Sequence, residues 1–338
     1  MASASVADDG TLLIATESDA AGSFELIALN RSGQGAKPVG TPAAEISSPA
    51  VSQDSRHVAM LRSVGGQRHV WVQETAGSAG VRLTFDDVDY GHPKWLPSGD
   101  RLLYSERGQS TSGAQVFAVA ADGSGKRQPL TAAHRAEVSP DGRDIVYLID
   151  DHGAGRLRYR KLELGGAAAT ASTPRPELRV FKTDPEPDVR DFTLSPDGRL
   201  LAYVDYKAGR ADLLVTRYPT GEGKWQVVAN GGRALYGSDD ALRWVRGTNE
   251  LFFPASGSDP DGGRLMAATV HDDARAVTIG QPAALFELDA DAFAGGFDVT
   301  PDGKTFFIRR RPAGQPKIIG RRFVLVQNWP AEFTGTRR

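Results

Sequence analysis

Charged side chains that could converge on a ligand recur in five short segments of this 338-residue sequence. Four of the five carry two or more carboxylates, and arginine or histidine is interleaved with them. Carboxylate, guanidinium and imidazole groups that meet in a concave surface can bind a polar or charged ligand. The segments are FDDVDYGH (85–92), TAAHRAE (131–137), DPEPDVRD (184–191), GSDDALR (237–243) and DADAFAGGFD (289–298).

The candidate ligand-binding residues are the charged residues in or beside these segments. A second interpretation stays open, in which the carboxylates are solvated turn residues and the two histidines are structural. The candidates are Asp87, Asp89, His92, Lys94, His134, Arg135, Glu137, Arg190, Asp191, Asp239, Asp240, Arg243 and Asp298.

Motifs for catalysis and metal binding are missing from the sequence. There is no G-x-S-x-G nucleophile elbow, no His-Arg-Asp or Asp-Phe-Gly of a protein kinase, and no cysteine. The six histidines show neither H-x-H nor H-E-x-x-H spacing. DGSGKR (122–127) lacks the leading Gly of a phosphate loop, and SDPDGG (258–263) lacks the terminal Glu of a calcium loop. We therefore predict no catalytic residue, no metal and no cofactor in this chain.

The elements that must position the charged residues are indicated by a recurrent turn. Ser195-Pro196-Asp197-Gly198 separates two short apolar runs. Pro presets φ at the second position of a type I turn, Asp can bond back to the backbone, and Gly supplies the left-handed residue. The segment is therefore predicted to be a hairpin with a structural turn. Closely similar turns stand at 139–142 and 300–303, and degraded copies lie within 6–17, 51–62, 95–106 and 244–255.

Aligned on the last residue of the turn, the seven copies follow one another at steps of roughly 43–56 residues. The aligned positions are Gly10, Ser55, Gly99, Gly142, Gly198, Thr248 and Gly303. Units of this length with four strand-sized pieces are typical of β-propeller blades.

We predict an all-β fold, a seven-bladed β-propeller of four-stranded antiparallel blades that forms one domain over residues 1–338, with six blades as the alternative. Nine residues follow RFVLVQNW (322–329), so the last blade is expected to have three strands unless upstream residues supply a fourth.

The inner strand of each blade should carry apolar residues four and six positions before the turn column, and mixed residues between them. In that intermediate register Lys94 and Glu137 fall on adjacent blades, as do Arg243 and Asp298. We predict two inter-blade ion pairs that line the channel, because unpaired charges there would be costly. The pairs either hold the blades in register or let a ligand exchange with Arg243 or Glu137.

Composition limits the partners. A net charge of −2 argues against a general phosphate-binding surface, so we predict no nucleic-acid partner. No run approaches the roughly 18 apolar residues of a membrane span. Since the chain enters the first repeat at once, it is expected to be part of a longer protein. As an isolated domain it is expected to be a monomer.

The turn column resembles the TolB/PD40 class of WD40-like propeller repeats. The order of several further segments resembles the extracytoplasmic C-terminal propeller of bacterial membrane-anchored Ser/Thr protein kinases. The sixth repeat departs from the pattern, with Arg246-Gly247-Thr248-Asn249 in place of Pro-Asp-Gly-Arg. The segments are LIALNRSGQGAKPVGTP (26–42), RHVWVQETAGSAGVRLTFDD (68–87), PTGEGKWQVVANGG (219–232), RLMAATV (264–270), PAALFEL (282–288) and FVLVQNW (323–329).

The resemblance implies a non-catalytic sensor that binds a protein, a peptide or an envelope-derived ligand at the channel mouth, outside the cytoplasm. Kinase activity would lie in an upstream domain. Two alternatives stay open: a TolB-like periplasmic scaffold, and a metal-dependent propeller lyase or peptidase-associated propeller. Fold alone does not decide among them.

Overall fold

The computed structural model describes residues 3–6, 12–16, 23–77, 80–107, 113–162, 164, 177–231, 235, 240–245, 247–257, 262–273, 276–312 and 322–326. The chain divides into two compact units, which are described separately. The larger unit is Phe24–Arg310, and the smaller one combines Met1–Ser23 with Arg311–Arg338. Within the described residues, no helix is long and apolar enough to cross a membrane.

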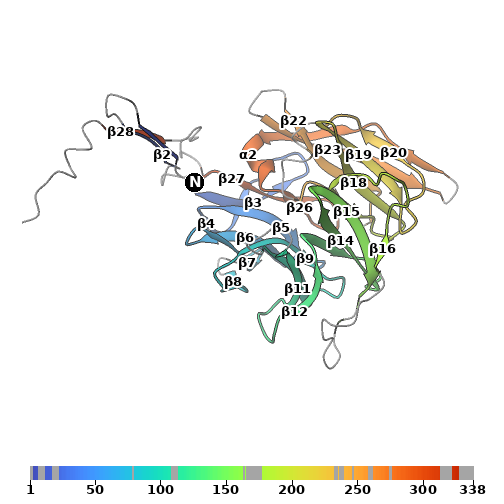
Figure 1. Ribbon diagram of the computed structural model, residues 1–338, viewed down its shortest axis with the longest axis horizontal. Coiled ribbons are helices and arrows are strands. Elements are labelled where there is room, and N and C mark those ends of the chain that lie inside the picture. The colour runs from blue at the N-terminus through green and yellow to red at the C-terminus, as the bar shows by residue number, and fades with distance from the viewer. Residues whose placement is uncertain are drawn as a thin grey trace, which may run out of the picture. The chain divides into compact units, whose positions relative to one another are not determined.

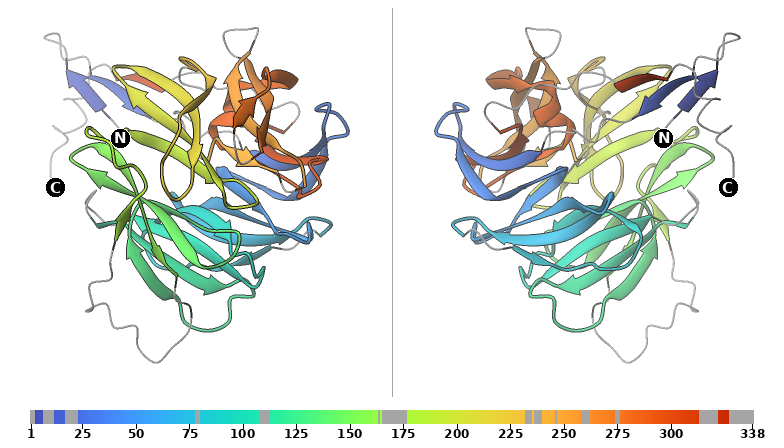
Figure 2. Two further views of the ribbon diagram at one scale, coloured as in Figure 1. Left: turned by 90° about the vertical axis from the view of Figure 1, so that its right-hand side faces the viewer. Right: turned by 90° about the vertical axis from the view of Figure 1, so that its left-hand side faces the viewer.

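The described part of the larger unit forms six antiparallel blades that succeed one another around a common centre in chain order (Figures 1 and 2). Blade 1 joins β26 (Phe297–Val299), β27 (Thr305–Arg310), β3 (Phe24–Asn30) and β4 (Lys37–Ala43). Blade 2 contains β5 (Ile46–Val51), β6 (His57–Val64), β7 (Gln67–Glu74) and β8 (Gly80–Arg82). Blade 3 contains β9 (Asp89–Trp95), β10 (Arg101–Arg107), β11 (Gln115–Ala120) and β12 (Gln128–Ala132).

The remaining three blades follow the same order from inner to outer strand. Blade 4 contains β13 (Arg135–Val138), β14 (Asp144–Asp151), β15 (Ala154–Lys161) and β16 (Leu178–Arg179). Blade 5 contains β17 (Val189–Leu194), β18 (Leu200–Lys207), β19 (Arg210–Arg217) and β20 (Trp225–Val228). Blade 6 contains β21 (Arg243–Trp244), β22 (Glu250–Ser256), β23 (Gly262–Asp272), β24 (Val277–Ile279) and β25 (Ala283–Asp289), and the short helix α2 (Ala290–Ala294) follows it.

The ring is closed by strand exchange between the two ends of the larger unit. β27 pairs antiparallel with β3, from Thr305 opposite Asn30 to Arg310 opposite Glu25. The inner half of blade 1 therefore comes from late in the chain and the outer half from early in it. The prediction of seven blades with a three-stranded last blade is wrong, and the six-bladed all-β alternative is confirmed. The reason is that β3 and β27 each leave an unpaired row of backbone groups, and pairing the two rows satisfies both.

The first copy of the repeat belongs to the smaller unit and forms none of the six blades. In the smaller unit, β2 (Leu12–Thr16) pairs with β1 (Ser3–Val6) on one side and with β28 (Arg322–Val326) on the other. These strands form a three-stranded sheet of their own, so the repeat signature of residues 6–17 predicted a hairpin but not a seventh blade of the ring.

The alternation of the inner strands matches the packing between blades. Phe192, Leu242 and Phe297 lie six positions before the turn column in their repeats and are at most 1% exposed. Blade 6 and blade 1 share an edge-to-face contact between Phe252 and Phe306, whose ring centroids are 5.3 Å apart. Apolar side chains at every second position thus fill the space between neighbouring blades.

The recurrent turn has the predicted left-handed residue and a side-chain cap. In blade 5 the Ser195 hydroxyl donates to Asp197 Oδ1 at 2.6 Å and accepts from the Leu200 amide at 2.8 Å, and Gly198 has φ 71°. Gly142 and Gly303 repeat this conformation, with φ 73° and 72°. These turns all lie where an inner strand ends, and we call that side of the ring the turn face and the opposite side the mouth face.

The turn of blade 6 differs from the others. The positive φ falls on Gly247 (75°), one residue before Thr248, which the alignment had placed in the glycine column. Val245 and Gly247 stand where blade 5 has Ser195 and Asp197, so this turn lacks the hydroxyl and the carboxylate of the side-chain cap.

Candidate functional site

Two tiers of equivalent positions recur on or just before the six inner strands, and their charged side chains contact one another across neighbouring blades. The middle tier stands five positions before the turn column, and the mouth tier stands seven positions before it. The middle tier consists of Ala50, Lys94, Glu137, Thr193, Arg243 and Asp298. The mouth tier consists of Ser48, His92, Arg135, Asp191, Ala241 and Gly296.

Both predicted ion pairs are present in the middle tier. Lys94 Nζ lies 3.8 Å from Glu137 Oε1, which joins blades 3 and 4. Arg243 Nε donates to Asp298 Oδ1 at 2.9 Å, which joins blades 6 and 1. Both distances are within the 4 Å limit of an ion pair, so the register deduced from the turn column is confirmed.

Asp240 is the centre of the network, and it reaches across the ring. Its carboxylate lies 3.2 Å from Lys94 Nζ, 3.1 Å from Arg135 Nη2 and 3.4 Å from His92 Nδ1. The side chain is fully buried. Burial alone would raise the pKa of Asp240, but the charges of Lys94 and Arg135 hold it well below its usual range. Asp240 also has φ 56°, a strained conformation for this residue type.

Arg135 and Asp191 extend the network from blade 4 to blades 5 and 6. Arg135 forms an ion pair with Asp191 and donates to the Phe192 carbonyl at 2.9 Å. Asp191 accepts from the backbone amide of Ala241 at 2.6 Å. Burial opposes the charged form of Arg135, yet the carboxylates of Asp191 and Asp240 raise its pKa.

Backbone groups complete the connections around the ring. Arg243 Nη2 donates to the Pro49 carbonyl of blade 2 at 3.3 Å, and Asp298 Oδ2 accepts from the Val51 amide at 2.6 Å. Glu137 Oε2 accepts from the Leu194 amide of blade 5 at 3.1 Å. All six inner strands therefore take part in one buried set of ion pairs and hydrogen bonds, which we call the channel network. Its charged groups already bind one another.

Eight of the candidate residues belong to the channel network, and of the other five the four that the structure describes do not. Asp89 pairs with Arg68 at 2.7 Å, and Arg190 pairs with Asp188 at 2.6 Å. The candidates were predicted as one site. In the structure they separate into the buried channel network and residues around it, among them Asp89 and Arg190, which pair elsewhere. The eight in the network are His92, Lys94, Arg135, Glu137, Asp191, Asp240, Arg243 and Asp298.

Three further candidates lie apart from the network or cannot be placed. His134 is half-buried, and burial lowers its pKa. Asp87 is exposed, and Asp239 lies outside the described residues. Among the described residues, no group of three or more His, Cys, Asp or Glu side chains is arranged to hold a metal ion.

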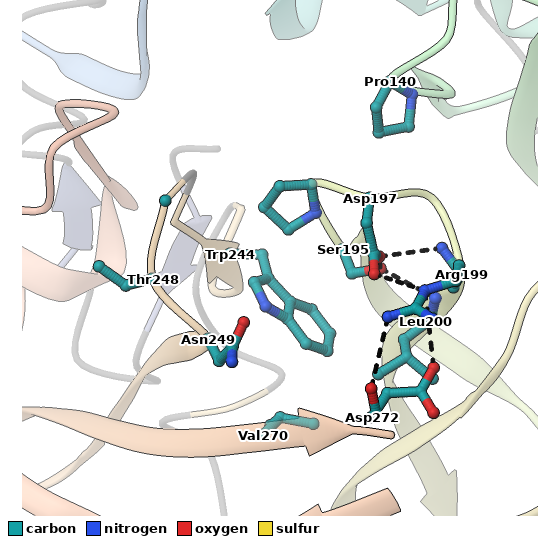
Figure 3. Close-up of a pocket in the computed structure, with 12 residues that line it drawn as sticks. Pro140, Ser195, Asp197, Arg199, Leu200, Trp244, Thr248, Asn249, Val270 and Asp272 are labelled. Carbon is teal, nitrogen blue, oxygen red and sulfur yellow. Dashed lines mark hydrogen bonds and ion pairs between the residues drawn. The ribbon is translucent and has the colours of Figure 1, made fainter. Parts of the chain in front are cut away.

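A second candidate site, which the sequence analysis did not identify, lies on the turn face between blades 5 and 6 (Figure 3). This cleft has a volume of about 630 Å³. Figure 3 shows Trp244 between the turn that carries Ser195 and Asp197 on one side and Thr248 with Asn249 on the other. We call it the turn-face cleft; its lining is Pro140, Ser195, Pro196, Asp197, Arg199, Leu200, Trp244, Gly247, Thr248, Asn249, Val270 and Asp272.

The only sequence signal for this cleft was the departure of the sixth turn from the repeat. Asn249 occupies the position held by Arg56, Arg143, Arg199 and Lys304 in other turns. The shorter side chain leaves room beside Trp244, at the place where the blade also lacks its turn cap.

Comparison with solved structures identifies the fold. A protein assigned as a TolB from Agrobacterium tumefaciens has a TM-score of 0.61 at 15% identity, over 86% of this chain and 98% of that one. TolB from Acinetobacter baumannii has a TM-score of 0.56 at 16% identity, over 78% of this chain and 67% of that one. The fold is that of a TolB-like β-propeller.

Other comparisons add no family. A scan against protein-family models and a search of curated proteins found no match. At the identities above, similarity to TolB structures establishes the fold of this TolB-like propeller and leaves its activity and partners open.

Proposed function

We propose that the chain is a non-catalytic, TolB-like binding propeller that docks a partner protein on its mouth face. The observation that carries the proposal is the exposure of Phe85, at 71%, in the loop that leads from blade 2 to blade 3 on that face. Exposed apolar patches mark sites of protein interaction, and aromatic residues are enriched where proteins bind one another.

The surroundings of Phe85 are those of a docking surface. The Arg82 guanidinium lies 5.0 Å from its ring centroid. Val64, 42% exposed, stands at the hairpin of blade 2, also on the mouth face. Asp87 stands two residues after Phe85, is exposed, and has no ion pair within the described residues. We infer a partner segment that places an apolar side chain on Phe85 and a lysine or arginine near Asp87.

The buried channel network supports a scaffold role over an enzyme role. Its carboxylates and guanidiniums neutralise one another, so they are suited to hold six blades in place rather than to exchange with a substrate. The exposed residues around the mouth are then left to bind the partner.

The finer proposal is that this propeller is the sensor region of a bacterial membrane-anchored Ser/Thr protein kinase and works outside the cytoplasm. It is supported by the order of the segments quoted above. The native gene tests it: kinase motifs followed by a membrane span upstream would support it. A cleavable leader without kinase motifs would contradict it and favour a periplasmic scaffold.

Site-specific cross-linking tests the docking surface. A photo-reactive amino acid replaces Phe85 in the full-length protein in its native cell, and the control carries it at Leu178, which is 49% exposed on blade 4. We expect one protein adduct from position 85 that is absent from position 178 and is lost when Asp87→Lys is added. Identical adducts from both positions, or no adduct from position 85, would overturn the proposal.

A further inference from the structure

We propose that the turn-face cleft binds a neutral sugar unit. In this proposal, the apolar face of the sugar ring packs on Trp244, and its hydroxyls bond to Asp197, Arg199 and Asn249. The inference concerns a different face and a different class of ligand from the protein docking proposed above, and it does not rest on it.

Among the described residues, each charged side chain of the cleft is paired, either within the lining or with the neighbouring Arg217, which favours a ligand without charge. Arg199 Nε donates to Asp197 Oδ2 at 2.7 Å and lies 3.7 Å from Asp272 Oδ2. Arg217 Nη1 approaches Asp272 at 3.2 Å from behind. Two guanidiniums thus face two carboxylates. An anionic or cationic ligand would have to displace one of these partners, whereas a neutral one would not.

The polar groups at the rim are held in place but still reach solvent. Asp197 Oδ1 accepts from the Ser195 hydroxyl and from the Arg199 amide, yet the side chains of Asp197 and Arg199 remain 47% and 53% exposed. Asn249 Nδ2 lies 3.1 Å from His271 Nδ1, which orients the amide. The rim therefore offers fixed acceptors and donors side by side. Hydroxyl groups, which both donate and accept, match such an alternating set.

The floor of the cleft supplies the apolar part of the site. Trp244 is half-buried and is the only aromatic residue among the described residues of the lining, to which Pro140 and Pro196 contribute from the turns of blades 4 and 5. A sugar ring has an apolar C–H face and a rim of hydroxyls, so it can cover the indole while its edge meets the polar groups. The volume lies in the range of sites that bind small ligands.

The test uses the whole chain and defined probes. Titration calorimetry measures binding of glucose, galactose and N-acetylglucosamine, of the linear trisaccharides of glucose and N-acetylglucosamine, and of glucuronic acid as a charged counterpart. We expect at least one neutral probe to bind and Trp244→Leu and Asp197→Asn each to weaken it by tenfold or more. Tighter binding of the trisaccharide than of its monomer would point to a glycan chain as the source, and equal binding to a free sugar.

Asp302→Asn is the matched control. Asp302 accepts the same two turn hydrogen bonds in blade 1, from Thr300 at 2.6 Å and Lys304 at 3.1 Å, but it does not line the cleft. Asp302→Asn should lower the melting temperature as Asp197→Asn does, but it should leave the affinity for the neutral probe unchanged. The proposal is overturned if no neutral probe binds, if glucuronic acid binds more tightly than glucose, or if both Asn variants change the affinity equally. None of these outcomes alters the cross-linking result at Phe85.

Discussion

Asp240 of the loop before β21 lies 3.2 Å from Lys94 Nζ of β9, a contact that crosses the ring from blade 6 to blade 3. The same carboxylate is 3.1 Å from Arg135 of blade 4. One fully buried side chain therefore connects blades that share no strand pairing. The channel network braces the ring through its centre, in addition to the contacts between neighbouring blades.

Asp240→Asn should be strongly destabilising. It leaves Lys94 and Arg135 buried with one carboxylate fewer, and removing one partner of a buried ion pair costs about 3–5 kcal/mol. Urea unfolding of the whole chain measures the loss. Asp89→Asn is the control, because the Asp89 carboxylate is 37% exposed and surface pairs contribute about 1 kcal/mol or less. Equal losses in the two variants would contradict the bracing role.

The contribution of Asp240 should depend on pH in acid. Its pKa in the folded protein is well below the value of about 3.9 for an unfolded chain. The stabilisation that the Asp240 charge provides is therefore fully present at pH values above the pKa of the unfolded chain, and it is lost as the pH falls through the pKa of the folded protein. The difference in unfolding free energy between wild type and Asp240→Asn should shrink as the pH falls from about 5 toward 2. A difference that is constant or grows in acid would show that the charge of Asp240 is not responsible.

Arg243 and Asp298 should be energetically coupled. Arg243 Nε donates to Asp298 at 2.9 Å, and both side chains are at most 15% exposed. A double-mutant cycle with Arg243→Met and Asp298→Asn should give a coupling of about 0.5–3 kcal/mol, the range for residues in direct contact. The same cycle on Arg190 and Asp188, an exposed pair at 2.6 Å, should give a smaller value. If the two substitutions of the buried pair Arg243–Asp298 have additive effects on stability, a stabilising role for this pair is ruled out.

Gly198→Val should destabilise the turn of blade 5. Gly198 has φ 71°, and a β-branched residue in this conformation costs about 1–3 kcal/mol. An added Cβ would meet Pro140 Cδ at 3.5 Å, an ordinary contact, so the cost comes from the backbone. Gly198→Asn should lower the stability by less, since Asn tolerates the left-handed region of backbone conformation. Thermal melting compares the two, and equal melting temperatures would contradict the backbone explanation.

The local sequence was enough to predict the parts of the site that depend on register. The turn column aligned Lys94 with Glu137 and Arg243 with Asp298, and both pairs form. Asp240, Lys94 and Arg135 were all recognised as candidates, but the contacts of Asp240 with the other two were not predicted. The turn-face cleft was not predicted, because it depends on how the side chains of two neighbouring turns leave space beside Trp244.

The turns and the strands beside them can be predicted from the sequence alone. The Ser-Pro-Asp-Gly cap forms among residues at most five positions apart, so its signature needs no knowledge of the rest of the chain. The number of blades, in contrast, could be established only from the tertiary structure. Seven copies of the turn exist, yet β3 completes the blade of β27, and the first copy pairs with β28. Which strand edges pair is a non-local choice, set by the backbone groups that remain unpaired after each hairpin has formed.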